Sequence, residues 1–167
     1  EIVEWWVGGG YDLTPFFPYA KDCLMWHKEA KAHFDKFNKK YYKEFAKNCD
    51  DYFFLPHRKE KRGIGGVFFD NFNELGLDLS MQMLKNTAKT YLNSYLKIIN
   101  LRKSREYTAK DKGFQEYRRG RYAEFNLLYD RGTSFGLQSG GRIESILASL
   151  PPQASWIYKN CLLYTSD

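Results

Sequence analysis

The chain has 167 residues, of which 43% are hydrophobic and 28% charged, proportions ordinary for one globular domain with a real core. Its three cysteines lack metal-ligand spacing, and no apolar run approaches the roughly 20 residues of a membrane span. These features exclude a disulfide framework and a membrane-spanning helix, and we expect a cytoplasmic protein. The net charge of +6 favours an anionic partner, which could be nucleic acid, acidic lipid or a polycarboxylate.

The N-terminal half predicts a strand, a pair of helices and a second strand, in that order. Ile2 to Val7 is rich in β-branched and aromatic residues and should form the first strand. From Tyr19 to about Asn48 apolar residues recur every three or four positions, which predicts helix, with a break at Asn38. Gly63 to Phe69 predicts a strand whose glycines let a neighbouring segment pass close. Because the chain opens inside strand-like sequence, we expect that it is cut from a longer protein.

The C-terminal half also mixes helices with strands. Leu79 to about Leu101 has the pattern of a long amphipathic helix, and Lys110 to Arg118 predicts a shorter one. Tyr122 to Tyr129 alternates between two faces, which is typical of a strand. A short helix should run from Ile143 to Leu150, and Trp156 to Tyr158 could be a last strand. With no repeat and no linker, we expect one α+β domain.

One segment near the N-terminus combines glycines, aromatic residues and a carboxylate. Trp5 to Phe17 reads WWVGGGYDLTPFF, and its three consecutive glycines suit a sharp bend or the close approach of another group. Asp12 follows the glycines and stands between aromatic residues, where a carboxylate could do chemistry. The alternative is a β-bulge in which Asp12 caps a turn.

Arginines beside histidine or glycine give further candidate sites. Arg58 follows His57, and together with Arg62 it could fork onto a carboxylate, although the interleaved lysines also suit a solvated loop. Arg131 and Arg142 each adjoin glycine. The second of these stands at a predicted helix start, where free backbone amides and an arginine could bind an anion.

A basic cluster with aromatic neighbours runs from Tyr117 to Tyr122 (YRRGRY). Such a pattern can grip a nucleic-acid backbone and stack its bases. It is equally typical of a helix C-terminus, where cations interact favourably with the helix dipole, and we prefer that interpretation.

Four of these stretches together resemble one protein family, the oxygen-dependent coproporphyrinogen III oxidases of haem biosynthesis. They are Trp5 to Pro15 (WWVGGGYDLTP), Cys49 to Asp70 (CDDYFFLPHRKEKRGIGGVFFD), Arg118 to Thr133 (RRGRYAEFNLLYDRGT) and Phe135 to Pro152 (FGLQSGGRIESILASLPP). Their order and spacing also fit the family. The resemblance implies the C-terminal half to two-thirds of such an enzyme. Residues 1–158 would be part of its catalytic domain, and 159–167 a tail outside the family pattern that we suspect is not native sequence.

The family's reaction is the oxidative decarboxylation of two propionates of coproporphyrinogen III to vinyl groups, which gives protoporphyrinogen IX. Molecular oxygen is the co-substrate, and no flavin or haem is required. The family's N-terminal portion, with its histidines and a substrate-binding Asn-x-Arg segment, is absent from this sequence, so we expect the chain alone to be inactive. The resemblance further implies a homodimer formed through the segment from Tyr122 to Ile157.

The resemblance also assigns roles to individual residues of this chain. Asp12 matches an aspartate proposed to hold the pyrrole N–H groups of the substrate and to assist their deprotonation. A carboxylate suits that role because it can accept several N–H hydrogen bonds at once and stabilise a developing cation. The family's carboxylate-binding arginines and a substrate-contact segment correspond to Arg58, Arg131, Gly140, Gly141 and Arg142.

Bacterial members of the family have been described with a divalent metal held by four histidines. His57 matches one of these positions, and two others would lie upstream of the chain. The fourth corresponds to Met25, whose thioether is a poor ligand for hard divalent metals. We therefore expect no required cofactor and keep His57 as the one candidate metal ligand.

The implied fold is α+β, a large and mostly antiparallel β-sheet flanked by α-helices, with the substrate in a cleft between sheet and helices. Two other functions stay open on the residues alone. One is a basic, aromatic module that binds RNA or single-stranded nucleic acid, and the other is an enzyme remnant retained only for dimerisation. The position of Asp12 separates them, because the oxidase needs it in a cleft near Arg58 and Arg131.

Overall fold

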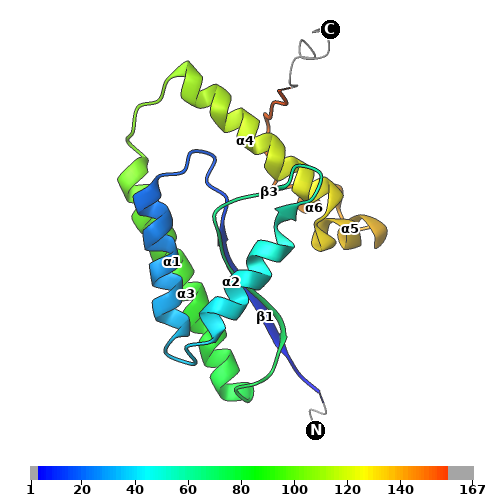
Figure 1. Cartoon of the computed structure of the whole chain (residues 1–167). Coiled ribbons are helices and arrows are strands. Elements are labelled where there is room, and N and C mark those ends of the chain that lie inside the picture. Colours follow the sequence, from blue (N-terminus) through cyan, green and yellow to red (C-terminus); the bar gives the residue numbers. More distant parts are fainter. Residues whose placement is uncertain (1–3, 158–167) are drawn as a thin grey trace, which may run out of the picture. The chain divides into compact units, whose positions relative to one another are not determined.

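The computed structural model describes residues 4–157 (Figure 1). The chain divides into two compact units, with the boundary in the sequence between residues 106 and 107. The first unit contains, in chain order, β1 (Val7–Leu13), α1 (Ala20–Phe34), α2 (Tyr41–Tyr52), β2 (Phe54–Leu55), β3 (Glu60–Lys61), β4 (Gly65–Phe72) and α3 (Leu77–Arg102). The second unit contains α4 (Ala109–Leu128), α5 (Arg131–Gln138) and α6 (Ile143–Ile146).

The chain is α+β, as expected, but residues 4–157 do not form the expected large sheet. They form two small antiparallel sheets, one of β1 with β4 and one of β2 with β3. Part of the reason is that segments predicted as strands are not strands. Residues 122–129 belong to α4 and its C-cap, and Trp156 and Ile157 lie outside any strand, while Tyr158 falls outside the described residues.

The first predicted strand is displaced along the chain. It was expected from Ile2 to Val7, but β1 begins at Val7 and runs through the three glycines, while residues 1–3 lie outside the described part. Glycine is depleted in strands, so composition placed the strand before the glycines rather than on them. The strand at Gly63 to Phe69 and the helices on either side of Asn38 are confirmed by β4, α1 and α2.

Pairing of β1 with β4 depends on a close approach of two backbones. Asp12 pairs with Gly66 and Tyr11 with Val67. Gly66 has a φ of +153°, and a Cβ added there would lie 1.8 Å from the carbonyl oxygen of Tyr11. The expected close passage at the glycines of this strand is therefore confirmed, and no residue with a side chain fits at this position.

Side chains of β1 and β4 alternate between a face that packs against the aromatic core and a more exposed face. Tyr11, Val67 and Phe69 are buried, and the helices of the first unit pack on their side of the sheet. The Tyr11 ring lies 4.1 Å from that of Trp26 in α1, and the Phe69 ring 4.9 Å from that of Phe45 in α2, measured between centroids. These aromatic contacts form the main core of the unit.

Helix α3 confirms the predicted long helix, and it lies beside α1 (Figure 1). A buried polar contact joins the two helices. His33 donates from Nε2 to the hydroxyl of Thr87 at 2.8 Å, because that hydroxyl donates in turn to the carbonyl of Met83. Burial lowers the pKa of His33, and nearby Lys36 lowers it further.

In the second unit, α4 is longer than the predicted helix and includes the segment expected to be a strand. Thr108 and Asp111 form a capping box at its start. The predicted strand put Phe125 and Leu127 on one face, but Phe125 is fully buried and Leu127 is 55% exposed. Arg121 and Phe125 are both buried four residues apart, which is the spacing of one helix face.

Helix α5 begins directly after Asp130, its N-cap residue. The carboxylate of Asp130 accepts hydrogen bonds from the backbone and the hydroxyl of Thr133 at 3.0 and 2.7 Å, which caps the helix. Gly140 and Gly141 then connect α5 to α6. Among residues 4–157 there is no helix both long and apolar enough to cross a membrane.

We expect Gly66→Ala to lower the free energy of unfolding by at least about 3 kcal/mol, because its methyl group meets the Tyr11 carbonyl and separates the two strands. Gly10→Ala is the matched control in the same strand pair. Its added Cβ would meet neighbours at 3.7 Å or more, so stability should stay unchanged or rise by up to about 1 kcal/mol. Urea denaturation measures both, and equal losses would contradict the assigned register.

We expect protonation of His33 to lower the free energy of unfolding as the pH decreases. Below about pH 6.5 the unfolded chain binds a proton at this ring that the folded chain binds less readily, so the free energy of unfolding decreases as the pH drops further. The decrease is at most about 1.4 kcal/mol per pH unit. Urea midpoints at about pH 7.5 and about pH 5.5 should differ less in His33→Gln than in the parent chain. An equal difference in the two chains would contradict this role of His33.

Candidate active site

Asp12 lies on the face of the sheet that points away from the aromatic core, beside Cys49 and Asp50 of α2. Its neighbour Tyr11 points into the core, so strand alternation turns Asp12 the other way. The cross-strand partner of Asp12 is Gly66, which has no side chain to cover it. The Asp12 side chain is 26% exposed. The carboxylate is therefore half-buried and still accessible from one side.

Arg62 binds Asp12 and is itself held in place by several neighbours. Its Nη2 donates to Oδ2 of Asp12, and its Nε donates to the hydroxyl of Thr14 at 3.0 Å. The guanidinium lies 3.8 Å from the centroid of the Phe53 ring, within the range of a cation–π contact. The Arg62 side chain is only 9% exposed. These contacts fix the orientation of the ion pair.

The pKa of Asp12 is raised above the usual value for an aspartate. Burial is the largest cause, since the charged carboxylate loses hydration. The positive charge and the hydrogen bond of Arg62 oppose this effect without cancelling it. A carboxyl group whose pKa is moved toward neutrality can exchange protons more readily, which is a property of acid–base catalysts.

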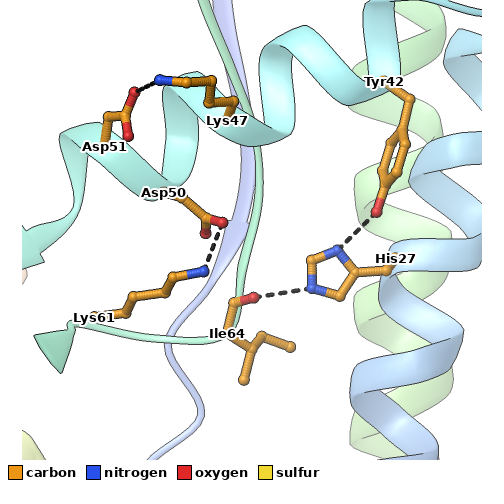
Figure 2. A network of polar contacts seen from close by, with 7 residues as sticks. All are labelled: His27, Tyr42, Lys47, Asp50, Asp51, Lys61 and Ile64. Atoms are coloured by element: carbon orange, nitrogen blue, oxygen red, sulfur yellow. Dashed lines mark hydrogen bonds and ion pairs between the residues drawn. The ribbon is translucent and has the colours of Figure 1, made fainter.

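A hydrogen-bonded clamp holds the segment that follows Arg62 (Figure 2). Nε2 of His27 in α1 donates to the carbonyl of Ile64 at 2.9 Å, and its Nδ1 lies 3.1 Å from the hydroxyl of Tyr42 in α2. The amide of Ile64 donates to the carbonyl of Leu13 at 3.0 Å. Lys61, on the other side of Arg62, pairs with Asp50. Both helices thus position the residues around the ion pair.

A small cavity of about 10 Å³ lies beside the ion pair, roughly the space for one water molecule. It is lined by Asp12, Leu13, Thr14, Cys49, Asp50, Phe53, Lys61, Arg62, Gly63 and Gly65. Cys49 is fully buried, and burial raises the pKa of its thiol to about 12. The cavity is too small to hold a macrocycle.

The structure pairs Asp12 with Arg62 rather than with Arg58. His57 and Arg58 lie in the exposed turn between β2 and β3, where the amide of Arg58 donates to the carbonyl of Leu55 at 3.1 Å. The sequence marked both arginines as able to bind a carboxylate, but it assigned the substrate role to Arg58. Arg62 is the functional candidate that the sequence did not rank, although its place before a glycine-rich strand was visible.

The other candidate residues belong to the second unit and are exposed there. Arg131 is the first residue of α5, and Gly140 has a φ of +70°, a left-handed conformation that suits glycine. Arg142 precedes α6, and its Nε lies 3.3 Å from a carboxylate oxygen of Glu144. Arg121, of the basic cluster, is buried against the Tyr117 ring, so it does not lie on an exposed basic face.

The residues present do not fit a divalent metal site. Among residues 4–157 there is no group of three or more His, Cys, Asp or Glu side chains arranged to hold an ion. His57 lies in an exposed turn, and the position expected to carry a further histidine holds Met25 in α1. No step of the chemistry proposed for this chain is routed through a metal.

We expect Arg62→Met to lower the free energy of unfolding by about 3 kcal/mol near neutral pH, because the half-buried Asp12 carboxylate loses its cationic partner. Removing this charge also raises the pKa of Asp12 further. The folded chain then keeps a proton that the unfolded chain has lost. The loss of stability should therefore be smallest in acid and grow as the pH rises through that raised pKa.

Urea denaturation of Arg62→Met between about pH 4 and about pH 7 tests this expectation. Lys61→Met is the neighbouring control, since Lys61 pairs with Asp50 at an exposed position and should contribute under about 1 kcal/mol. Equal losses in the two variants, or a loss in Arg62→Met that does not change with pH, would count against a stabilising Asp12–Arg62 pair.

Comparison with known proteins agrees with the resemblance seen in the sequence. The family model for coproporphyrinogen III oxidase matches residues 1–166. The oxygen-dependent coproporphyrinogen-III oxidase of Francisella tularensis subsp. novicida is 55% identical over 154 residues, which cover 92% of this chain and 50% of that protein. The protein of the same name from Francisella philomiragia is 54% identical over the same length. The chain spans about half the length of these curated relatives, and it belongs to the coproporphyrinogen III oxidase family.

Proposed function

We propose that this chain supplies the Asp12 part of an oxygen-dependent coproporphyrinogen III oxidase. Such an enzyme converts two propionates of coproporphyrinogen III to vinyl groups and yields protoporphyrinogen IX. The observation that carries the proposal is a half-buried carboxylate of raised pKa on a glycine-rich strand, oriented by a buried arginine. The names of the Francisella relatives support the same reaction.

Asp12 would act on the pyrrole N–H groups of the substrate. Oδ2 is engaged by Arg62, while Oδ1 lies toward Gly10, 3.9 Å from the point where a Cβ of that residue would be. A carboxylate oxygen placed there could accept a pyrrole N–H and then its proton. Losing that proton makes the ring richer in electrons. A propionate can then lose carbon dioxide together with a proton and two electrons from its β carbon, which leaves the vinyl group. Molecular oxygen accepts the two electrons with two protons to give hydrogen peroxide, without an organic cofactor.

Cationic side chains would bind the propionates of the substrate. Guanidinium groups suit this role because they form paired hydrogen bonds with a carboxylate. We assign it to Arg58 and Arg131, with Gly140, Gly141 and Arg142 as the further contact segment. We also propose that the enzyme is cytoplasmic and a homodimer formed through residues 122–157. These assignments extend the family resemblance to the individual residues.

We expect the isolated 167-residue chain to produce no protoporphyrin from coproporphyrinogen III and oxygen, because the family's upstream histidines and Asn-x-Arg segment are absent from it. A hybrid in which this chain replaces the matching half of the Francisella novicida enzyme should be active. In that hybrid, Asp12→Asn should lower kcat/KM by about 100-fold or more, as expected for loss of a group that stabilises developing charge. Protoporphyrin fluorescence measures the product.

Asp51→Asn is the control variant in the hybrid, because Asp51 pairs with Lys47 on the exposed side of α2 and should not affect turnover. Circular dichroism checks that each variant is folded. Normal turnover by the isolated chain would contradict the expected inactivity. A folded Asp12→Asn hybrid as active as the parent would contradict the role given to Asp12.

A further inference from the structure

Two of the three consecutive glycines of β1, Gly9 and Gly10, differ in how closely other residues pack around them. A Cβ added at Gly9 would lie 3.0 Å from the Phe69 ring and 3.1 Å from Leu84, so the core leaves little room for a side chain there. A Cβ added at Gly10 would meet its neighbours only at ordinary distances, the nearest at 3.7 Å. Gly10 also has no left-handed φ. The packing of the described residues thus leaves the glycine at position 10 unexplained.

Gly10 lies on the same face of the sheet as Asp12, away from the aromatic core. Strand alternation places the two residues on one side of β1, and Gly10 pairs across the sheet with Phe68. The Phe68 ring stacks almost parallel on that of Tyr52, with 4.8 Å between centroids. Gly10 itself is exposed. The face therefore has a bare peptide backbone in the middle, an aromatic pair on one side and the Asp12 carboxylate at the next position along the strand.

We propose that Gly10 is a specificity-determining residue, whose missing side chain lets a pyrrole ring of a tetrapyrrole lie directly on the backbone of β1. This inference rests on the proposed function. The ring would contact the peptide at Gly10, with its edge against Phe68 and its N–H directed at Oδ1 of Asp12. A methyl group at position 10 would stand 3.9 Å from that oxygen and occupy the space of the ring.

A purely structural explanation of Gly10 makes a different prediction. Phe68 could simply shield the glycine, as aromatic residues do opposite glycines in other sheets. In that case a side chain at position 10 would be neutral for any ligand. The two explanations can be separated because Gly10→Ala has room for its methyl group, so binding can change while the fold does not.

The test uses the hybrid enzyme and coproporphyrin III, the stable and fluorescent oxidised form of the substrate. Titration followed by porphyrin absorbance and fluorescence gives Kd. We expect Gly10→Val to raise Kd at least about tenfold and Gly10→Ala to raise it less, with melting temperatures equal to or slightly above that of the parent. Gly113→Ala, where an added Cβ meets nothing within 4 Å, is the control and should bind like the parent.

Each outcome decides a separate point. If the parent hybrid binds porphyrin and both Gly10 variants bind equally well, the role of Gly10 is overturned while the proposed function stands. If the parent hybrid neither binds porphyrin nor forms protoporphyrin, the proposed function fails, whereas an active parent hybrid that binds no porphyrin overturns only the role of Gly10. Should valine lower the melting temperature, the alanine variant decides the matter. Weaker binding at an unchanged melting temperature supports the role of Gly10.

Discussion

The contact between the backbones of Gly66 and Tyr11 determines where the functional groups lie in the first unit. It fixes the register of β1 against β4, because the carbonyl of Tyr11 occupies the space that any side chain at position 66 would need. Since side chains alternate along a strand, a shift of one residue would bury Asp12 and expel Tyr11. The same contact therefore places the aromatic core on one side of the sheet, and Gly10, the Asp12 carboxylate and the Phe68 ring on the other.

On that face two effects act on one carboxylate in opposite directions. Burial makes the charge of Asp12 costly, and the guanidinium of Arg62 reduces that cost. Arg62 can do so only because Thr14 and Phe53 hold it. His27 and Tyr42 in turn fix the Ile64 segment (Figure 2). The properties of Asp12 thus depend on residues from both helices and from the loops between them.

Helical periodicity and the placement of glycines predicted most elements of the first unit correctly, whereas a short alternation in the second unit predicted a strand where the chain is helical. The three- and four-residue periodicity identified α1, α2 and α3, and the glycines of β4 identified a close backbone approach. The alternation at residues 122–129 indicated a strand, yet the chain there continues a helix begun at the Thr108 capping box. Over eight residues, alternation and a helical face share many positions, so the longer context decides.

The candidate site, likewise, could be predicted only in part from the sequence. Asp12 was evident from the sequence because it follows three glycines. The choice between Arg58 and Arg62 was not, since it depends on the reversal of the chain between β2 and β3. That turn exposes Arg58 and returns Arg62 to Phe53, whose carbonyl accepts the Arg62 amide at 3.0 Å.

Cys49 lines the small cavity beside Asp12, and with a pKa of about 12 its thiol stays protonated at neutral pH. Because peroxides and other oxidants react with the thiolate, this protonated thiol is unreactive toward them. A cysteine can thus lie beside the Asp12 carboxylate without being readily oxidised.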